Sequence, residues 1–172
     1  MKLTLLPVAF ALIVPTSGVL ASSSDWFEME GARIRLVTAG APDGEGRLKG
    51  ALDIELKPGW KTYWRDPGDA GVPPTIDVSA NAGLSGATFD FPAPQRHDEG
   101  DFQWAGYDYS VRLPVTFTLR DPSSPSTIDA NVFLGVCETI CVPVQATLKV
   151  DLSHYADNPA HQSAVAKAFA AI

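Results

Sequence analysis

Apolar residues alternate with polar ones along much of the chain, which is the pattern of β-strands that bury one face. In residues 46–56, for example, apolar side chains occupy every second position from Leu48 onward, except at Gly50. Glycine and proline residues separate these runs, and both favour turns. The pattern predicts strands over residues 32–37, 46–56, 60–64, 75–78, 86–91, 109–119, 127–136 and 142–151.

Two segments break the alternation. Residues 66–74 contain three prolines and two glycines, and we expect them to be irregular. The last segment, residues 158–172, begins with Asn-Pro and is rich in alanine, with Val165, Phe169 and Ile172 at helical spacing. This spacing predicts a terminal helix that packs against the strands or extends toward a partner.

The strands and turns together predict the fold class. Fourteen glycines and fourteen prolines argue against a helical bundle and favour many short strands joined by turns. Pro92, Pro94, Pro114 and Pro122 are expected at strand ends or edges, where a missing N–H is tolerated. Seven to nine short strands predict an all-β, immunoglobulin-like two-sheet β-sandwich, here with a short C-terminal helix.

Composition narrows the classes of function. The chain has 172 residues, of which 45% are hydrophobic, enough for one domain of ordinary size. Thirteen Lys and Arg residues against 20 Asp and Glu residues give a net charge of −7, which argues against a nucleic-acid-binding surface. Two cysteines are too few for a disulfide-dense scaffold, and they form no four-ligand zinc site without the three histidines.

The N-terminus has the pattern of a signal peptide. Lys2 precedes an apolar stretch over residues 3–15, and Ala21 is the small residue after which we expect cleavage. The alternative, an uncleaved anchor or a buried strand, is disfavoured because the stretch is short and contains Pro7 and Pro15. We therefore expect an exported, periplasmic protein, in a compartment where disulfides persist. The expected organisation is a signal peptide over residues 1–21, a β-sandwich over residues 22–157 and a C-terminal helix or tail over residues 158–172.

The two cysteines lie between two predicted strands. Cys137 and Cys141 are four residues apart, which on one straight strand corresponds to about 13 Å. A disulfide needs Cα atoms within about 7 Å of each other, so the chain must turn between the two residues. Either a three-residue hairpin loop over residues 138–140 or a single helical turn brings them together.

Three interpretations of this pair are open. A structural disulfide is the ordinary one, but closing a loop of about five residues restricts the unfolded chain by only about 2 kcal/mol, against about 4–5 kcal/mol for distant cysteines. A short loop tends to strain the bond, and strained, exposed disulfides are the labile or catalytic ones. As a third interpretation, the dithiol holds Cu(I), with His97, His154 or His161 as a further ligand.

Several motifs, taken in order, resemble one family. They are Pro-Gly-Trp-Lys-Thr-Tyr-Trp-Arg-Asp-Pro-Gly-Asp-Ala-Gly at 58–71, Phe-Pro-Ala-Pro at 91–94, His-Asp-Glu-Gly at 97–100, Leu-Pro-Val at 113–115 and Val-Cys-Glu-Thr-Ile-Cys-Val-Pro at 136–143. This set resembles the amino-terminal domain of the DsbD thiol:disulfide interchange proteins, including the related ScsB group. The resemblance extends over roughly residues 26–152.

The resemblance implies an immunoglobulin-like sandwich whose cysteine pair passes electrons by thiol–disulfide exchange to periplasmic partners. In that family a membrane-embedded domain and a thioredoxin-like domain supply the electrons, and the recipients are disulfide isomerases and cytochrome-maturation proteins. The sequence ends at Ile172 with neither of these two domains. We therefore expect a protein-disulfide reductase component that needs an electron donor in trans and no cofactor besides its disulfide.

The resemblance also implies a cap over the cysteines. In the family a loop with an aromatic residue covers the pair, and acidic side chains lie nearby. The matching stretch is residues 97–107, in which Phe102 is the expected cap and Trp104 the alternative. Asp98 or Glu99 is the expected acid. The other interpretation of this stretch is a solvated acidic loop with one buried aromatic.

Three further expectations concern neighbours of the cap and of the pair. Gly100 and Gly106 suit a loop that opens, because hinges absorb backbone changes. Tyr63 falls near a family position beside the cysteines, although an aromatic residue in a strand is more often part of the core. By analogy with the family, Cys141 is the attacking residue and Cys137 the resolving one.

The charges next to the pair in the sequence favour a weakly nucleophilic dithiol. No Lys, Arg or His adjoins Cys137 or Cys141, whereas Glu138 lies between them. A carboxylate raises the pKa of a neighbouring thiol by repulsion of like charges, and only the thiolate attacks a disulfide. We therefore expect thiols that react poorly in the isolated domain and better within a complex.

Overall fold

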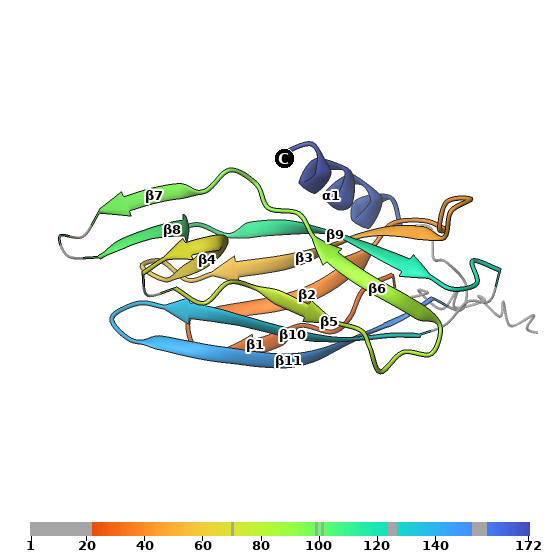
Figure 1. Cartoon of the computed structure of the whole chain (residues 1–172), viewed down its shortest axis with the longest axis horizontal. Helices are drawn as coiled ribbons and strands as arrows, with labels where there is room; N and C mark the ends of the chain where they lie inside the picture. The colour runs from red at the N-terminus through yellow and green to blue at the C-terminus, as the bar shows by residue number, and fades with distance from the viewer. Residues whose placement is uncertain (1–21, 70, 99, 101, 124–126, 153–157) are drawn as a thin grey trace, which may run out of the picture.

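Two antiparallel sheets face each other in the structure, with one short helix on the outside (Figure 1). It is a computed structural model that describes residues 22–69, 71–98, 100, 102–123, 127–152 and 158–172. The predicted signal peptide, residues 1–21, lies outside the described residues. Among the described residues, no helix is long and apolar enough to cross a membrane.

The first sheet contains five strands and the second six. In spatial order the first consists of β1 (Phe27–Met29), β2 (Ala32–Thr38), β3 (Arg47–Leu56), β9 (Val111–Leu119) and β6 (Leu84–Phe89). The second consists of β11 (Cys141–Asp151), β10 (Thr127–Cys137), β4 (Lys61–Gly68), β8 (Gln103–Tyr107) and β7 (Gln95–Asp98), with β5 (Thr75–Asp77) paired to β10. The all-β, two-sheet sandwich that the alternating pattern predicts is confirmed.

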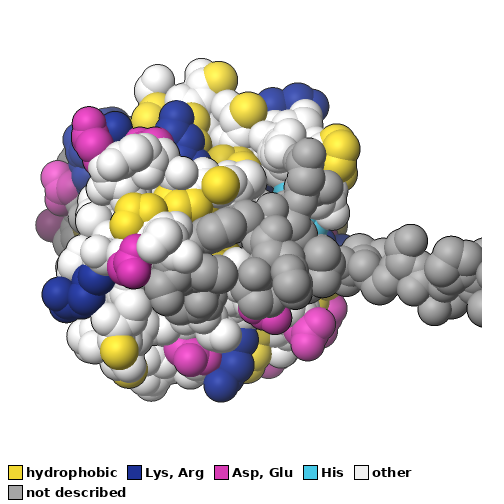
Figure 2. All heavy atoms as spheres, turned by 90° about the vertical axis from the view of Figure 1, so that its right-hand side faces the viewer, with side chains coloured by type: hydrophobic (Ala, Val, Ile, Leu, Met, Phe, Trp, Pro, Cys, Tyr) yellow, Lys and Arg dark blue, Asp and Glu magenta, His cyan; other side chains and the backbone are white. Residues whose placement is uncertain are grey.

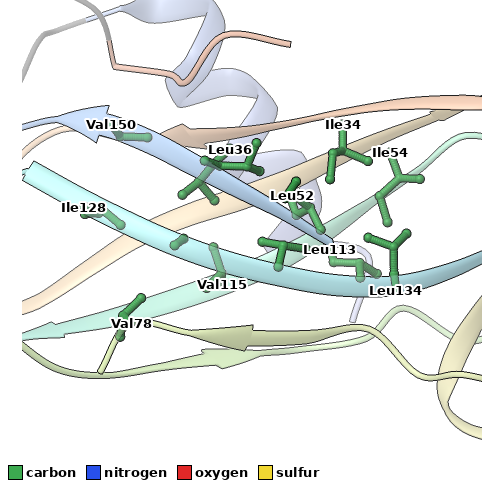
Figure 3. Close-up of a cluster of buried hydrophobic side chains, with 14 of the residues drawn as sticks. Ile34, Leu36, Leu52, Ile54, Val78, Leu113, Val115, Ile128, Leu134 and Val150 are labelled. Atoms are coloured by element: carbon green, nitrogen blue, oxygen red, sulfur yellow. The ribbon is translucent and has the colours of Figure 1, made fainter. Parts of the chain in front are cut away.

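The core lies between the two sheets and follows from the period of two along each strand. On β10, the alternate residues Ile128, Val132, Leu134 and Val136 are fully buried. They face apolar side chains of the first sheet, among them Leu113 (Figure 3). Residues of odd number on β10, including Cys137, therefore lie on the outer face of the six-stranded sheet.

The described residues contain eleven strands, whereas the sequence predicted seven to nine. Three of the eleven were not predicted. The missed strands are β1, β7 and β8, all of which are short. β7 is an edge strand of polar residues with no buried side chain, so it carries no hydrophobic alternation. β4 also extends to Gly68, into the stretch predicted to be irregular, because a bulge after Tyr63 lets it continue along β8.

Pro114 was expected at a strand end or edge but lies inside β9, between two neighbouring strands. Its carbonyl accepts a hydrogen bond from the Asp90 backbone N–H, at 2.9 Å. Because N–H and C=O of one strand residue point the same way, the proline nitrogen also faces that side, where β6 has already ended at Phe89. The hydrogen bond that proline cannot donate here, to the Asp90 carbonyl, lies beyond the end of β6, so β6 itself loses none.

The C-terminal helix, α1 (Pro159–Phe169), is confirmed and lies on the outer face of the five-stranded sheet (Figure 1). Asn158 caps it, since its side chain accepts hydrogen bonds from the first turn. Val165 and Ala168 pack on a small apolar patch of β2 and β3. Phe169 is half-buried there, whereas Ile172 is 59% exposed and beyond the helix, so its predicted place in the apolar stripe was wrong.

The opposite end of the sandwich from the β10–β11 turn carries mixed charges. Figure 2 shows this end, with Lys and Arg side chains interspersed among Asp and Glu. On this face the basic residues do not gather into one stripe. Cys137 and Cys141 lie at the other end, next to the β10–β11 turn.

Candidate redox site

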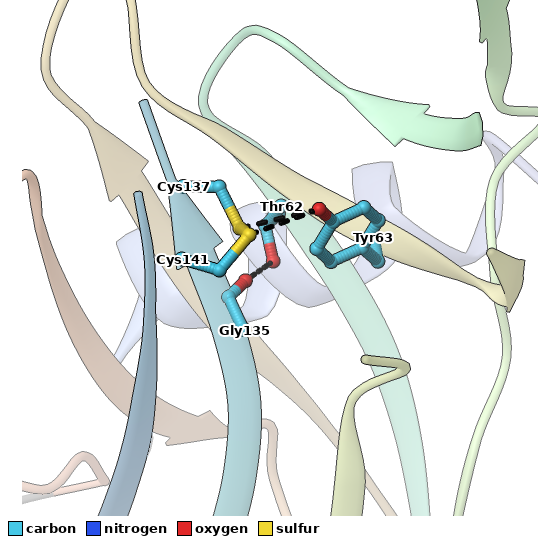
Figure 4. Close-up of a disulfide and its surroundings, with 5 residues drawn as sticks. All are labelled: Thr62, Tyr63, Gly135, Cys137 and Cys141. Carbon is cyan, nitrogen blue, oxygen red and sulfur yellow. Dashed lines mark hydrogen bonds between the residues drawn. A yellow bond between two sulfur atoms is a disulfide. The ribbon is translucent and has the colours of Figure 1, made fainter. Parts of the chain in front are cut away.

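The two cysteines lie directly opposite each other at the end of a long hairpin. β10 and β11 pair over their whole length, and the last pair in the register is Cys137 with Cys141. Residues 138–140 form the connecting loop, in which the Glu138 N–H donates to the Ile140 carbonyl at 3.3 Å. The Cα atoms are 4.0 Å apart and the sulfurs form a disulfide (Figure 4). Of the two arrangements that the spacing permits, the three-residue loop is therefore the right one.

The two residues of the disulfide differ in exposure. Cys137 is 1% exposed, whereas Cys141 is exposed. Both lie on the outer face of the six-stranded sheet, because the residues before Cys137 on β10 alternate into the core. Cys137 belongs to a small cluster with Tyr63 and Trp104, and these two aromatic side chains bury it. An attacking group from outside thus meets Cys141 first.

Tyr63 contacts both sulfurs. Its hydroxyl oxygen lies 3.3 Å from Cys141 Sγ and 3.2 Å from Cys137 Sγ (Figure 4). Disulfide sulfur has no hydrogen, so the hydroxyl is the donor. The same hydroxyl is placed to donate to a thiolate after reduction, and hydrogen bonds to charged acceptors are the stronger ones.

Two glycines make room for the Tyr63 ring. A Cβ atom on Gly135 of β10 would lie 3.3 Å from the ring, and one on Gly71 would lie 2.7 Å from its Cδ1. The missing side chains let the ring lie against both backbones and reach the disulfide. On the other face of β4, the Thr62 hydroxyl donates to the Gly135 carbonyl at 2.8 Å and holds β4 against β10 (Figure 4).

An aromatic row continues from the disulfide toward the edge of the sheet. Trp104 meets the Tyr63 ring edge to face, with 6.2 Å between the centroids. His97 stacks on Trp104 at 3.9 Å with the planes 8° apart, because the two are cross-strand partners on β7 and β8. The row therefore crosses β10, β4, β8 and β7 on one face.

Comparison with known proteins identifies the family of this cysteine hairpin. The family model for the N-terminal part of the thiol:disulfide interchange protein DsbD matches residues 36–153. The chain belongs to the DsbD N-terminal domain family. No curated protein matches it.

Two solved structures are similar to this DsbD-type domain. The N-terminal periplasmic domain of ScsB from Proteus mirabilis is 27% identical, with a TM-score of 0.73 over 88% of this chain. This chain spans 59% of the length of that one. The N-terminal domain of Neisseria meningitidis DsbD in the reduced form is 15% identical over 67% of this chain and 84% of that one, with a TM-score of 0.38. The immunoglobulin-like fold expected from the sequence is confirmed.

The stretch expected to be a cap loop is a hairpin. Residues 97 and 98 belong to β7 and residues 103–107 form β8, so paired strands occupy most of the stretch. Gly100, between the two strands, has φ +77°, which suits glycine. Gly106 is not a hinge, because it lies within β8, where a Cβ would be 2.2 Å from the Thr62 carbonyl oxygen. Its glycine permits the close approach of β4 and β8.

The two candidate cap residues have different environments. Phe102 follows the hairpin turn and is 58% exposed, whereas Trp104 is 8% exposed within the cluster beside Cys137. Asp98 is exposed on β7 and lines a hollow of about 260 Å³ beside Trp104. Among the described residues, the lining of this hollow includes neither cysteine. Glu99 lies outside the described residues.

The role of Phe102 as cap stays a prediction with a direct test. We expect Phe102→Ala to speed alkylation of the reduced protein, because removal of the ring from the hairpin turn opens the approach to Cys141. Phe133→Ala is the matched control, since Phe133 is a half-exposed phenylalanine on the outer face of β10. Equal labelling rates for Phe102→Ala and wild type would remove Phe102 from this role.

The described histidines are engaged away from the sulfurs. His97 stacks on Trp104, and His161 on α1 shares a hydrogen bond with the Ser22 hydroxyl. Burial lowers the pKa of His161, and the charge of Arg35 lowers it further. His154 lies outside the described residues. Among the described residues, no group of three or more His, Cys, Asp or Glu is placed to hold a metal ion.

A lysine that the sequence did not connect with the cysteines lies across the ladder from Cys137. Lys61 on β4 is the cross-strand partner of Cys137, although 76 positions separate them along the chain. The carboxylate of Glu138 lies toward the turn between β3 and β4, where a Cβ on Gly59 would be 3.4 Å from it. The strand pattern of β4 indicates that Lys61 and Tyr63 share one face, because they are two residues apart. Only the pairing of β4 with β10 brings that face to the cysteines.

Proposed function

We propose that this protein is a periplasmic thiol:disulfide interchange domain that passes electrons from the Cys137/Cys141 dithiol to disulfides of partner proteins. The observation that carries the proposal is the asymmetry of the pair, in which Cys141 is exposed and Cys137 is 1% exposed. An exchange protein needs one accessible sulfur to meet a partner and a second one close by to resolve the complex.

The chemistry balances with the two cysteines alone. The Cys141 thiolate attacks one sulfur of the partner's disulfide; a bond forms between the two proteins, and the partner's other sulfur leaves as a thiolate. Cys137 then gives up its proton and attacks Cys141 Sγ, which re-forms the internal disulfide and releases the second partner thiolate. The partner gains two electrons and two protons, and the domain loses them.

The surroundings of the pair suit a docking partner. Ile140 in the loop is 74% exposed, and Phe102 is 58% exposed in the β7–β8 turn at the same end of the sandwich (Figure 1). Exposed apolar side chains around an exposed sulfur favour contact with another protein. The expected recipients are disulfide isomerases or cytochrome-maturation proteins, by the family resemblance.

The same proposal includes an electron donor and a compartment. One dithiol carries one electron pair, and the sequence contains two cysteines, so each cycle requires reduction from outside the pair. A membrane-embedded or thioredoxin-like donor in trans serves this step. The signal-peptide pattern of residues 1–21 supports export, and the similar ScsB domain is described as periplasmic.

The reduction potential of the Cys137/Cys141 couple tests this function. We expect equilibration of the folded protein with glutathione or dithiothreitol buffers to give a value above about −300 mV, because structural disulfides typically lie below that limit. Gel-shift alkylation of the two thiols reports the reduced fraction. A disulfide that stays closed in millimolar dithiothreitol while the protein remains folded would instead indicate a structural bond.

A further inference from the structure

Lys61 and Cys137 are neighbours across the β4–β10 ladder. They are paired in the register, and directly opposed residues of antiparallel strands have Cβ atoms about 4.5–5.5 Å apart. Tyr63, two residues further on β4, lies on the same face and touches the sulfurs. The stem of Lys61 therefore starts beside the disulfide.

The ammonium group of Lys61 lies over the Trp104 ring, 4.2 Å from its centroid. The pair is oxidised in this structure, and a disulfide carries no charge that attracts a cation. An aromatic face attracts an ammonium group by its quadrupole. A lysine side chain is flexible over four carbons, so the same group is able to reach either ring or sulfur.

We propose that Lys61 is the electrostatic partner of the reduced pair and stabilises the thiolate of Cys141. This inference rests on the proposed function, since it assigns a residue to the same exchange reaction. On reduction by the dithiol of the donor protein, the S–S bond breaks, the pair gains two electrons and two protons, and the donor dithiol becomes a disulfide. The Cys141 thiol then loses its proton to solvent. The negative charge that remains on sulfur is what the ammonium group stabilises.

Other ionisable groups around the pair act on the same charge. From β4, the Tyr63 hydroxyl donates to the sulfurs and favours the thiolate. From the β10–β11 turn, Glu138 opposes it, although its carboxylate lies toward Gly59. From β7, His97 contacts the Trp104 ring rather than the sulfurs. Lys61 thus supplies a positive charge on the strand that flanks Cys137.

A single-thiol background isolates the effect. In the full chain with Cys137→Ser, Cys141 is the one remaining thiol, and its alkylation by neutral iodoacetamide from pH 5 to 10 follows the thiolate fraction. An opposite charge within 4–6 Å shifts an ionisation by about one unit or more. We expect Lys61→Met to move the midpoint of the profile upward by about one pH unit, so the rate at neutral pH falls about tenfold.

Two controls separate this effect from others. Lys61→Arg keeps the charge and is expected to retain the wild-type profile. Lys149→Met also removes one lysine charge, from a residue on the same face of β11 as Cys141. The two residues are eight positions apart on the strand, which corresponds to about 26 Å. That distance exceeds the screening length of about 8 Å at physiological salt, so its profile is expected to stay unchanged.

The alkylation profiles test the role of Lys61, and the reduction potential tests the exchange function on which that role rests. A Lys61→Met profile that overlays its parent, or an equal shift in Lys149→Met, would overturn the role of Lys61. If Lys61→Met fails to fold, Lys61→Gln serves as the second neutral variant under the same criteria. The reduction potential of the protein with both cysteines is measured separately. If the disulfide exchanges but the alkylation profile does not move, only the role of Lys61 is rejected. If the disulfide does not exchange, the proposed function is rejected.

Discussion

Cys137→Ser is expected to accumulate a stable mixed disulfide with a partner, whereas Cys141→Ser abolishes electron transfer. The reason is the difference in exposure, because Cys141 is accessible and Cys137 lies behind Tyr63 and Trp104. Without the Cys137 thiol, the complex formed by Cys141 has no internal attacker to resolve it. Without the Cys141 thiol, the remaining sulfur does not reach a partner.

Non-reducing electrophoresis with mass spectrometry measures this result. Each variant is incubated with an oxidised disulfide-isomerase or thioredoxin-like partner, and the cross-linked band is mapped to the cysteine that carries it. The double serine variant is the control for association without a covalent bond. Trapping by Cys141→Ser instead would reverse the assignment of attacker and resolver, and no trapping by either variant would contradict the exchange mechanism.

Leu134→Ala is expected to lower the free energy of unfolding by about 2–5 kcal/mol, the range for a leucine removed from a well-packed core. Leu134 is fully buried on β10, three residues before Cys137, with its side chain between the two sheets (Figure 3). The strands around the resulting cavity are held in place by their pairing within each sheet, so they do not close it. Urea unfolding followed by circular dichroism gives the difference between variant and wild type.

Gln145→Ala on the neighbouring strand is the matched control. Gln145 is exposed on the outer face of β11, one position along the register from the partner of Leu134. Surface substitutions of this kind usually change stability by less than about 0.5 kcal/mol. A loss in Leu134→Ala no larger than in Gln145→Ala would contradict the assignment of the even-numbered face of β10 to the core.

Local pattern was sufficient for most of the fold. The alternation on β3 and β10 predicts half-buried strands because every second side chain must leave water, and this requirement acts within a few residues. The Asn-Pro start of α1 is equally local, since Asn158 caps its own first turn. The immunoglobulin-like sandwich and the family followed from such features together with the motifs in their order.

Edge strands and bulges were not predictable in this way. β7 buries no side chain and exists because β8 offers it a hydrogen-bonding partner. The segment therefore looks like a loop when its sequence is considered alone. Gly106 shows the same limit, because its role is set by the Thr62 carbonyl of another strand rather than by its neighbours in the chain.

By itself, the sequence determined that the chain must turn between Cys137 and Cys141 if they form a disulfide, because four residues of extended chain exceed the reach of that bond. The order of its motifs also indicated the family, which the match to residues 36–153 confirms. Only the tertiary structure decided which face of the sheet carries the sulfurs, which of them is exposed, and which side chains contact them. Those properties depend on β4 pairing with β10, a contact between segments more than 70 residues apart that places Lys61 and Tyr63 beside the cysteines. Hydrogen-bonded pairing between distant strands leaves no local pattern in either strand, so the environment of the disulfide exists only once the sheet has formed.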